Sequence, residues 1–154
     1  MLELSRKSDY ALRAVIYLAR LAPDRYGRVS EIAKVRQIPQ AFLAQILPLL
    51  ASRGVVRSQQ GAHGGYTLAR KPSQITFLEV IEAVEGPLRL NKCTGDEHED
   101  CSLMETCEMH SIWNKAQKQT VDFLGNVTME DMLAASHHRP TGDQTTQSSV
   151  AGNQ

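Results

Sequence analysis

The chain has 154 residues, of which 42% are apolar and 5% aromatic, and this composition allows one compact core with an appended segment. Its longest apolar runs, residues 14–21 and 42–51, fall short of the roughly 20 residues that span a bilayer, and residues 1–10 do not resemble a cleaved signal, so we expect a cytoplasmic protein without membrane contact. The net charge is zero, but the two halves of the chain differ in sign. Residues 1–71 hold 12 Lys+Arg and 4 Asp+Glu, whereas residues 72–136 hold 4 Lys+Arg and 12 Asp+Glu. The basic half suits contact with nucleic-acid phosphates.

Three helices are predicted in the first third of the chain. Apolar side chains at three- and four-residue steps predict a helix over residues 8–21. Ser30 is a suitable N-cap for a short helix over 30–37, with Ile32, Ala33 and Val35 facing inward. Residues 39–53 predict a third helix that Pro48 bends without breaking. Its expected apolar face consists of Phe42, Leu43, Ile46, Leu47, Leu49 and Leu50.

A β-hairpin is predicted directly after these helices. Residues 55–58 and 66–69 have the composition of short strands, and the glycine-rich segment 59–65 joins them. Helix, short helix, turn, helix and hairpin in this order describe a winged helix-turn-helix. We therefore expect a mainly α fold with a small β-hairpin wing, in which residues 1–71 form the DNA-binding region.

The second half predicts a short helix, a long helix and a last short helix. Thr76 and Glu79 have capping-box spacing, as have Thr128 and Asp131. Residues 109–126 form an amphipathic helix with more apolar surface than so small a chain covers alone, which favours a homodimer. We thus assign 72–136 to a cysteine loop and dimerisation helices, and we expect 137–154 to be a disordered polar tail.

All three cysteines of the chain, Cys93, Cys101 and Cys107, lie close together in the sequence, and His110 follows them. Three thiols cannot all pair within one chain, and a reducing cytoplasm disfavours disulfides. Soft thiolates bind zinc, copper(I) or iron-sulfur clusters, and the unequal spacings lack the paired knuckles of structural zinc sites. An iron-sulfur cluster is therefore favoured over zinc, although spacing alone leaves both open.

The sequence resembles the iron-sulfur winged-helix transcriptional regulators that include IscR, NsrR and the iron-responsive RirA. The matching stretches are SDYALRA at 8–14, GAHGGY at 61–66, VIEAVEG at 80–86 and the three cysteines in order. The resemblance covers residues 1 to about 135. It implies a homodimer on a palindromic, double-stranded operator, with cluster state setting the DNA affinity.

The same resemblance implies the DNA contacts. It places Gln40, Phe42, Ala44 and Gln45 on the exposed part of the recognition helix, where Gln40 and Gln45 suit adenine edges. Relatives commonly have arginine where Gln60 stands, an arginine suited to a narrow minor groove. In this sequence we expect the wing to contact DNA through four residues in place of that arginine: Arg57, Gln59, Gln60 and His63.

The fourth cluster ligand stays open between two residues. His110 matches the branch with a 2Fe-2S cluster on three cysteines and one histidine. Asp9 matches a branch in which an acidic residue of the partner subunit completes a 4Fe-4S cluster, and the seven-residue first gap between cysteines favours this branch. The competing interpretations are that His110 is a surface histidine near a helix N-terminus and that Asp9 is the N-terminal cap of the first helix.

Two other functions fit the same residues. A regulator of the same fold would use the cysteines for thiol-redox or zinc sensing. An electron-transfer protein is less compatible, because such carriers usually supply four cysteines per cluster and residues 61–65 lie between strands instead of opening a nucleotide-binding helix. No catalytic set of residues is recognised, so we do not expect an enzyme.

Overall fold

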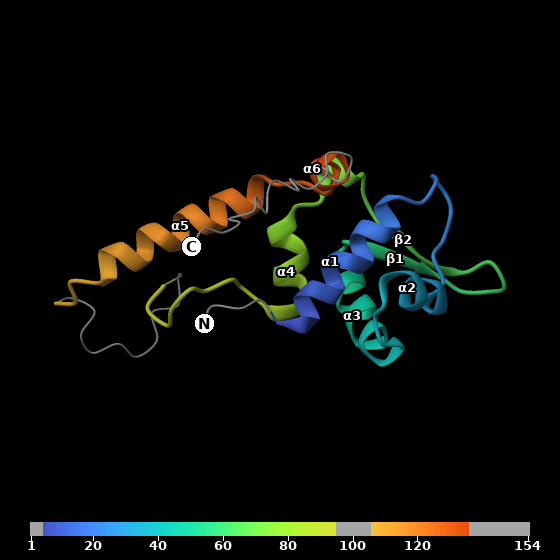
Figure 1. Cartoon of the computed structure of the whole chain (residues 1–154), viewed down its shortest axis with the longest axis horizontal. Coiled ribbons are helices and arrows are strands. Elements are labelled where there is room, and N and C mark those ends of the chain that lie inside the picture. The colour runs from blue at the N-terminus through green and yellow to red at the C-terminus, as the bar shows by residue number, and fades with distance from the viewer. Residues whose placement is uncertain (1–4, 95–105, 136–154) are drawn as a thin grey trace, which may run out of the picture.

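The computed structural model describes residues 5–94 and 106–135. Two features predicted above, Cys101 as a ligand and the disordered tail at 137–154, lie outside these residues. The elements are α1 (Arg6–Ala19), α2 (Val29–Arg36), α3 (Gln40–Ser52), β1 (Val56–Gln59), β2 (Gly65–Leu68), the 3₁₀ turn η1 (Pro72–Gln74), α4 (Phe77–Glu85), α5 (His110–Asn126) and α6 (Met129–Ala135). Figure 1 shows α1 to α4 and the hairpin gathered into one body, from which α5 projects.

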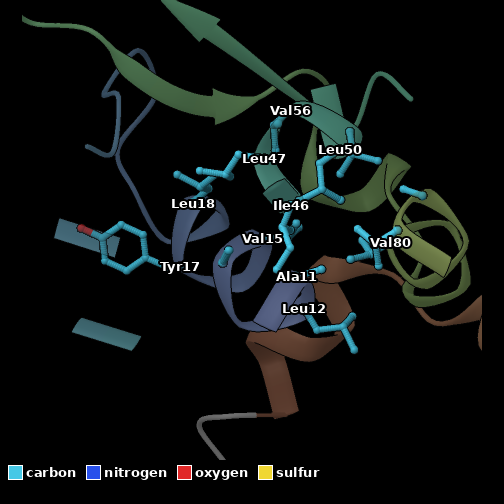
Figure 2. Close-up of a cluster of buried hydrophobic side chains, with 14 of the residues drawn as sticks. Ala11, Leu12, Val15, Tyr17, Leu18, Ile46, Leu47, Leu50, Val56 and Val80 are labelled. Atoms are coloured by element: carbon cyan, nitrogen blue, oxygen red, sulfur yellow. The ribbon is translucent and has the colours of Figure 1, made fainter. Parts of the chain in front are cut away.

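Helix α1 lies at the centre of the hydrophobic core (Figure 2). Ala11, Ala14 and Val15 are completely buried on it, and they face fully buried side chains of α3 and α4. The buried residues of α3 are Leu43, Ile46, Leu47 and Leu50, and those of α4 include Val80 and Ile81. Their three- and four-residue spacing gives each helix one apolar stripe, which is the reason these sequences form packed helices.

The hairpin confirms the predicted wing. Strands β1 and β2 pair antiparallel, with Val56 opposite Leu68 and Gln59 opposite Gly65. Gly27 adds a short bridge to it, because its N–H donates to the Tyr66 carbonyl at 2.8 Å and its carbonyl accepts from the Tyr66 N–H at 2.9 Å. Together with α1–α3 this hairpin forms the expected winged helix-turn-helix, in a mostly helical fold.

Two predicted helix starts are wrong. Helix α1 begins at Arg6, because the Ser5 hydroxyl accepts the backbone N–H groups of Lys7 and Ser8 at 3.1 and 3.3 Å. Asp9 is therefore not the cap. Helix α2 begins at Val29, so Ser30 lies inside its first turn and does not cap it.

Three predicted core positions are wrong as well. Val35, Phe42 and Leu49 are 57%, 38% and 37% exposed. The buried stripe of α3 runs through positions 43, 46, 47 and 50. Because each residue of a helix is rotated by about 100° from the one before it, positions 42 and 49 lie at the edge of this stripe. Pro48 is inside α3, which continues to Ser52 as expected.

The capping predictions of the second half have different outcomes. Thr128 and Asp131 form the complete reciprocal pair: the Asp131 N–H donates to the Thr128 hydroxyl at 3.1 Å, and the Thr128 N–H donates to the Asp131 carboxylate at 2.8 Å. The Thr76 hydroxyl accepts the Glu79 N–H at 3.2 Å, but the Glu79 carboxylate pairs with Arg70. Glu79 thus forms an ion pair with Arg70 in place of the second hydrogen bond of the capping box.

Helix α5 has the apolar face that the sequence predicts, and this face is only partly covered in one chain. None of its residues is buried, and both Ile112 and Phe123 are 68% exposed. Of the helices in residues 5–94 and 106–135, none combines the length and the apolar character that a membrane crossing needs.

Candidate functional site

The outer side of α3 presents the residues expected to read bases. Gln40, Ala44 and Gln45 are exposed on α3, outside its buried stripe. Phe42 is only partly exposed because its ring packs on Tyr10 of α1, with 5.2 Å between the ring centroids and 72° between the ring planes. This surface therefore combines two exposed glutamine amides with exposed apolar side chains, among them Phe42, which packs against Tyr10 of α1.

Tyr10 belongs to a chain of contacts that reaches the N-terminal turn of α1. The Arg13 guanidinium lies over the Tyr10 ring, 5.9 Å from its centroid. Arg13 also forms an ion pair with Asp9, with 2.7 Å between Nη2 and Oδ2. Asp9, the candidate cluster ligand, is thus connected to Phe42 through Arg13 and Tyr10. The Asp9–Arg13 and Tyr10–Arg13 steps, four and three residues apart on one helix, are visible in the sequence, whereas the Tyr10–Phe42 step is not.

The wing presents the second set of expected DNA-contacting residues. Arg57, Gln59, Gln60 and His63 are all exposed, on β1 and the loop after it. The wing tip is held by Arg28, whose guanidinium donates to the Ala62 carbonyl at 2.6 Å. Sequence reasoning missed Arg28, because 34 residues separate the two groups and neither forms part of a motif.

A polar cluster connects α1 and α2. The Tyr17 hydroxyl and Arg25 both donate to Glu31 Oε1, at 2.5 and 2.7 Å, and the Arg36 guanidinium lies 5.7 Å from the Tyr17 ring centroid. Burial, and then the hydrogen bond to Glu31, raise the pKa of Tyr17. Burial and the neighbouring Arg20 lower the pKa of Arg36. No sequence motif marks this cluster, which orients α2 against α1.

Two of the three cysteines lie within the described residues. Cys93 and Cys107 are free thiols, and both are partly buried. The described residues contain no group of three His, Cys, Asp or Glu side chains placed to hold a metal ion, and Cys101 is outside them. The donor set is nevertheless the one that soft metal centres use, because it consists of unpaired thiols at the base of α5.

His110 begins α5, one turn after Cys107. Its backbone N–H donates to the Cys107 carbonyl at 3.1 Å. Its ring Nε2 lies 2.8 Å from the Asn114 side-chain nitrogen, which is a donor, so Nε2 accepts this hydrogen bond. An imidazole nitrogen that ligates a metal uses the same lone pair. In this arrangement Asn114 therefore competes with a metal for Nε2.

The segment that carries Cys93, residues 87–94, is joined to the end of α4, which also contacts the start of α1. Leu88 N–H donates to the Glu82 carboxylate at 3.0 Å, at the end of α4. Glu85, one turn further on α4, accepts from the hydroxyls of Ser5 and Ser8, the latter at 3.0 Å. The start of α1, where Asp9 lies, and the start of the Cys93 segment thus meet at the C-terminal end of α4.

Comparisons with known proteins agree with this geometry. A family model named Rrf2 and described as an iron-dependent transcriptional regulator matches residues 4–135. A protein of Aquifex aeolicus named as an HTH-type transcriptional regulator is 38% identical over 125 residues, 80% of this chain and 86% of its own. The B. subtilis structure of CymR, titled the global cysteine regulator, has a TM-score of 0.71 and 28% identity over 90% of this chain and 100% of its own. The structure of T. potens IscR has a TM-score of 0.69 and 28% identity, and the match covers 96% of this chain and 94% of its own.

Proposed function

Because the chain belongs to the Rrf2 family of transcriptional regulators, we propose that it binds operator DNA as a homodimer and that an iron-sulfur cluster controls this binding. The observation that carries the proposal is the grouping of all three cysteines within residues 93–107, directly before the long helix of a winged helix-turn-helix protein. Residues 1–71 would contact DNA, and residues 72–136 would hold the cluster and the partner subunit.

The DNA-binding part of the proposal rests on exposure and charge. Gln40, Phe42 and Gln45 on α3 would enter the major groove, where a glutamine amide can bond both N6 and N7 of adenine. The basic half of the chain supplies phosphate contacts. On the wing, Arg57, Gln59, Gln60 and His63 would lie along the adjacent backbone and minor groove.

Cys93, Cys101 and Cys107 would hold the cluster. When bound, it supplies a centre that responds to oxygen, nitric oxide or iron supply. Of the two candidate fourth ligands, Asp9 of the partner subunit is favoured, and with it a 4Fe-4S cluster. The Asp9–Arg13 ion pair is about half exposed and such pairs are weak, whereas the His110 Nε2 lone pair is taken by Asn114.

The contact chain on α1 explains how ligation would reach the DNA. A carboxylate that donates its charge to a metal attracts Arg13 less strongly, and Arg13 also lies over the Tyr10 ring. Tyr10 in turn packs against Phe42 on the recognition helix. A change at Asp9 would therefore alter the orientation of Phe42 through Arg13 and Tyr10.

The test is an anaerobic purification followed by native mass spectrometry and visible absorption. We expect an iron-containing, coloured dimer whose affinity for a duplex selected from a random pool differs between loaded and cluster-free protein in the same salt. Asp9→Ala should lower the iron content, and His110→Ala should not. Colourless protein without iron after anaerobic reconstitution contradicts the cluster, and equal affinities contradict the control of binding.

A second function is favoured by one observation, namely the free and partly buried thiols Cys93 and Cys107. In this alternative the cysteines bind zinc or respond to oxidation, in a protein whose fold is similar to that of the cysteine regulator CymR. Zinc found by metal analysis, or operator binding that changes on thiol oxidation without any iron, would support it. Electron transfer has less support, because the relatives are transcriptional regulators.

A further inference from the structure

Gln117, a residue of α5 that no motif singles out, connects that helix to the Cys93 segment by two hydrogen bonds. The Gln117 Oε1 accepts the Leu90 backbone N–H at 2.8 Å, and its Nε2 donates to the Leu88 carbonyl at 2.5 Å. One side-chain amide thus pairs with the segment as a neighbouring strand would, with one donor and one acceptor. Two such bonds fix both the position and the direction of the segment on the helix.

The segment then forms a turn around Cys93, in which Thr94 bonds back to Asn91. Thr94 is fully buried, and its hydroxyl lies 2.7 Å from the Asn91 carbonyl and 3.3 Å from Gln117 Oε1. Its single proton serves the nearer carbonyl, and the Thr94 backbone N–H donates to the same carbonyl at 3.1 Å. Cys93 therefore sits in a tight turn between Asn91 and Thr94 that rests on Gln117.

We propose that Gln117 is a positioning residue for Cys93: its amide holds residues 88–90, which lead into the turn, against α5 and so determines where the Cys93 thiolate is presented. The inference rests on the proposed function, since it assigns a role in metal binding to a residue that touches no metal. It also links that role to the long helix, because residues 88–90 cannot shift relative to α5 without moving Gln117 or breaking the two hydrogen bonds. Backbone groups around a ligand are fixed in this way in well-defined metal sites.

The first experiment uses the cluster-free protein, so that it does not depend on iron. In Gln117→Leu we expect the Leu90 amide to exchange its hydrogen about five- to tenfold faster, as expected for the loss of one intramolecular hydrogen bond. Gln117→Glu keeps the acceptor and should leave Leu90 protected, and Gln119→Leu, an exposed glutamine of the same helix, is the matched control. Unchanged exchange at Leu90 in Gln117→Leu would overturn the proposal.

The second experiment uses anaerobically reconstituted protein. We expect Gln117→Leu to change the shape of the visible circular dichroism of the cluster and to lose iron to a chelator several times faster, while Gln119→Leu matches the wild type. A faster Leu90 exchange with an unchanged spectrum and unchanged iron loss would show a purely structural hydrogen bond and overturn the positioning role. If the wild type itself takes up no iron, the proposed function fails, and the exchange data then leave Gln117 as a structural contact only.

Discussion

The phenol ring of Tyr10 meets the phenyl ring of Phe42 edge to face, with 5.2 Å between centroids, and thereby joins the first helix to the recognition helix. Such aromatic pairs contribute about 0.5–1.5 kcal/mol beyond the area they bury. The pair orients Phe42 on the helix that also exposes the amides of Gln40 and Gln45. It is also the last step of the contact chain that begins at Asp9.

Replacing Tyr10 should therefore weaken DNA binding. We expect Tyr10→Leu to lower the affinity for a duplex selected by the wild type by about threefold to tenfold, which corresponds to the energy of one aromatic pair. Fluorescence anisotropy of the labelled duplex measures the effect. Tyr10→Phe retains the ring and should bind like the wild type, so a loss of affinity in both variants would point to the hydroxyl instead.

Arg57 provides a test of phosphate binding by the wing. Arg57→Ala should weaken binding and should reduce the slope of log affinity against log salt by about 0.9 for each phosphate that the variant no longer neutralises. Anisotropy titrations at several salt concentrations give the slope. Lys118→Ala, on an exposed side of α5, should leave it unchanged. An unaltered slope in Arg57→Ala would show that Arg57 does not bind a phosphate.

The exposed face of α5 provides a test of the homodimer. Phe123 is 68% exposed in one chain, and a second copy would cover it. Phe123→Glu would bury a charge in that interface, so we expect the variant to sediment as a monomer at concentrations at which the wild type is a dimer. Lys118→Glu, on another side of the helix by its spacing from Phe123, is the control. A dimeric Phe123→Glu protein would place the subunit interface elsewhere.

Two glycines should respond to alanine in opposite directions. At Gly65 the φ angle is +148°, and a Cβ would lie 2.4 Å from the Gly27 carbonyl oxygen, so Gly65→Ala should lower the free energy of unfolding by about 2–3 kcal/mol. In α5 a Cβ on Gly125 would meet only Leu78 Cδ2, at 3.6 Å. Gly125→Ala should therefore raise the free energy of unfolding by about 0.5–1 kcal/mol through helix propensity. Urea denaturation measures both, and a destabilised Gly125→Ala would show that α5 is packed differently.

The cap of α6 should depend on pH. The Thr128 side chain, and then its backbone, donate hydrogen bonds to Asp131 and lower the pKa of that carboxyl. Because the folded pKa lies below the unfolded value, the cap contributes stability above the usual aspartate range, and this contribution is lost as the pH falls through the lowered pKa. Carbon-13 NMR of the Asp131 carboxyl measures the titration. Thr128→Ala should move the pKa up toward its ordinary value, and an unchanged pKa would contradict the hydrogen bond.

Local patterns were sufficient to predict the described helices and strands to within a few residues. The buried positions of α3 follow from its period, and the Thr128–Asp131 pair follows from cap spacing. The errors lie at helix starts and at the edges of buried stripes. Ser30 is a good cap by residue type, but the chain enters α2 in an extended conformation at Arg28, with φ −74° and ψ 146°, so that Ser30 already lies inside the helix.

The candidate site was predictable as a set of residues but not as a set of contacts. Clustering in the sequence identified the cysteines, and the family resemblance identified Asp9 and the exposed positions of α3. Neither identified Arg28, which bonds to the wing tip, or Gln117, which bonds to the segment before Cys93. Their partners are backbone groups 34 and 27 residues away. A backbone carbonyl has no sequence signature.

The sequence by itself determined the order of the helices and the hairpin, the faces they bury and the resemblance to cluster-binding regulators, because periodicity, caps and motif spacing are local properties of a chain. Only the tertiary structure decided that Tyr10 rests on Phe42 and that the amide of Gln117 pairs with the backbone of Leu88 and Leu90. Contacts of this kind depend on how packed helices are rotated and displaced relative to one another, and that arrangement minimises the free energy of the whole core instead of any one segment.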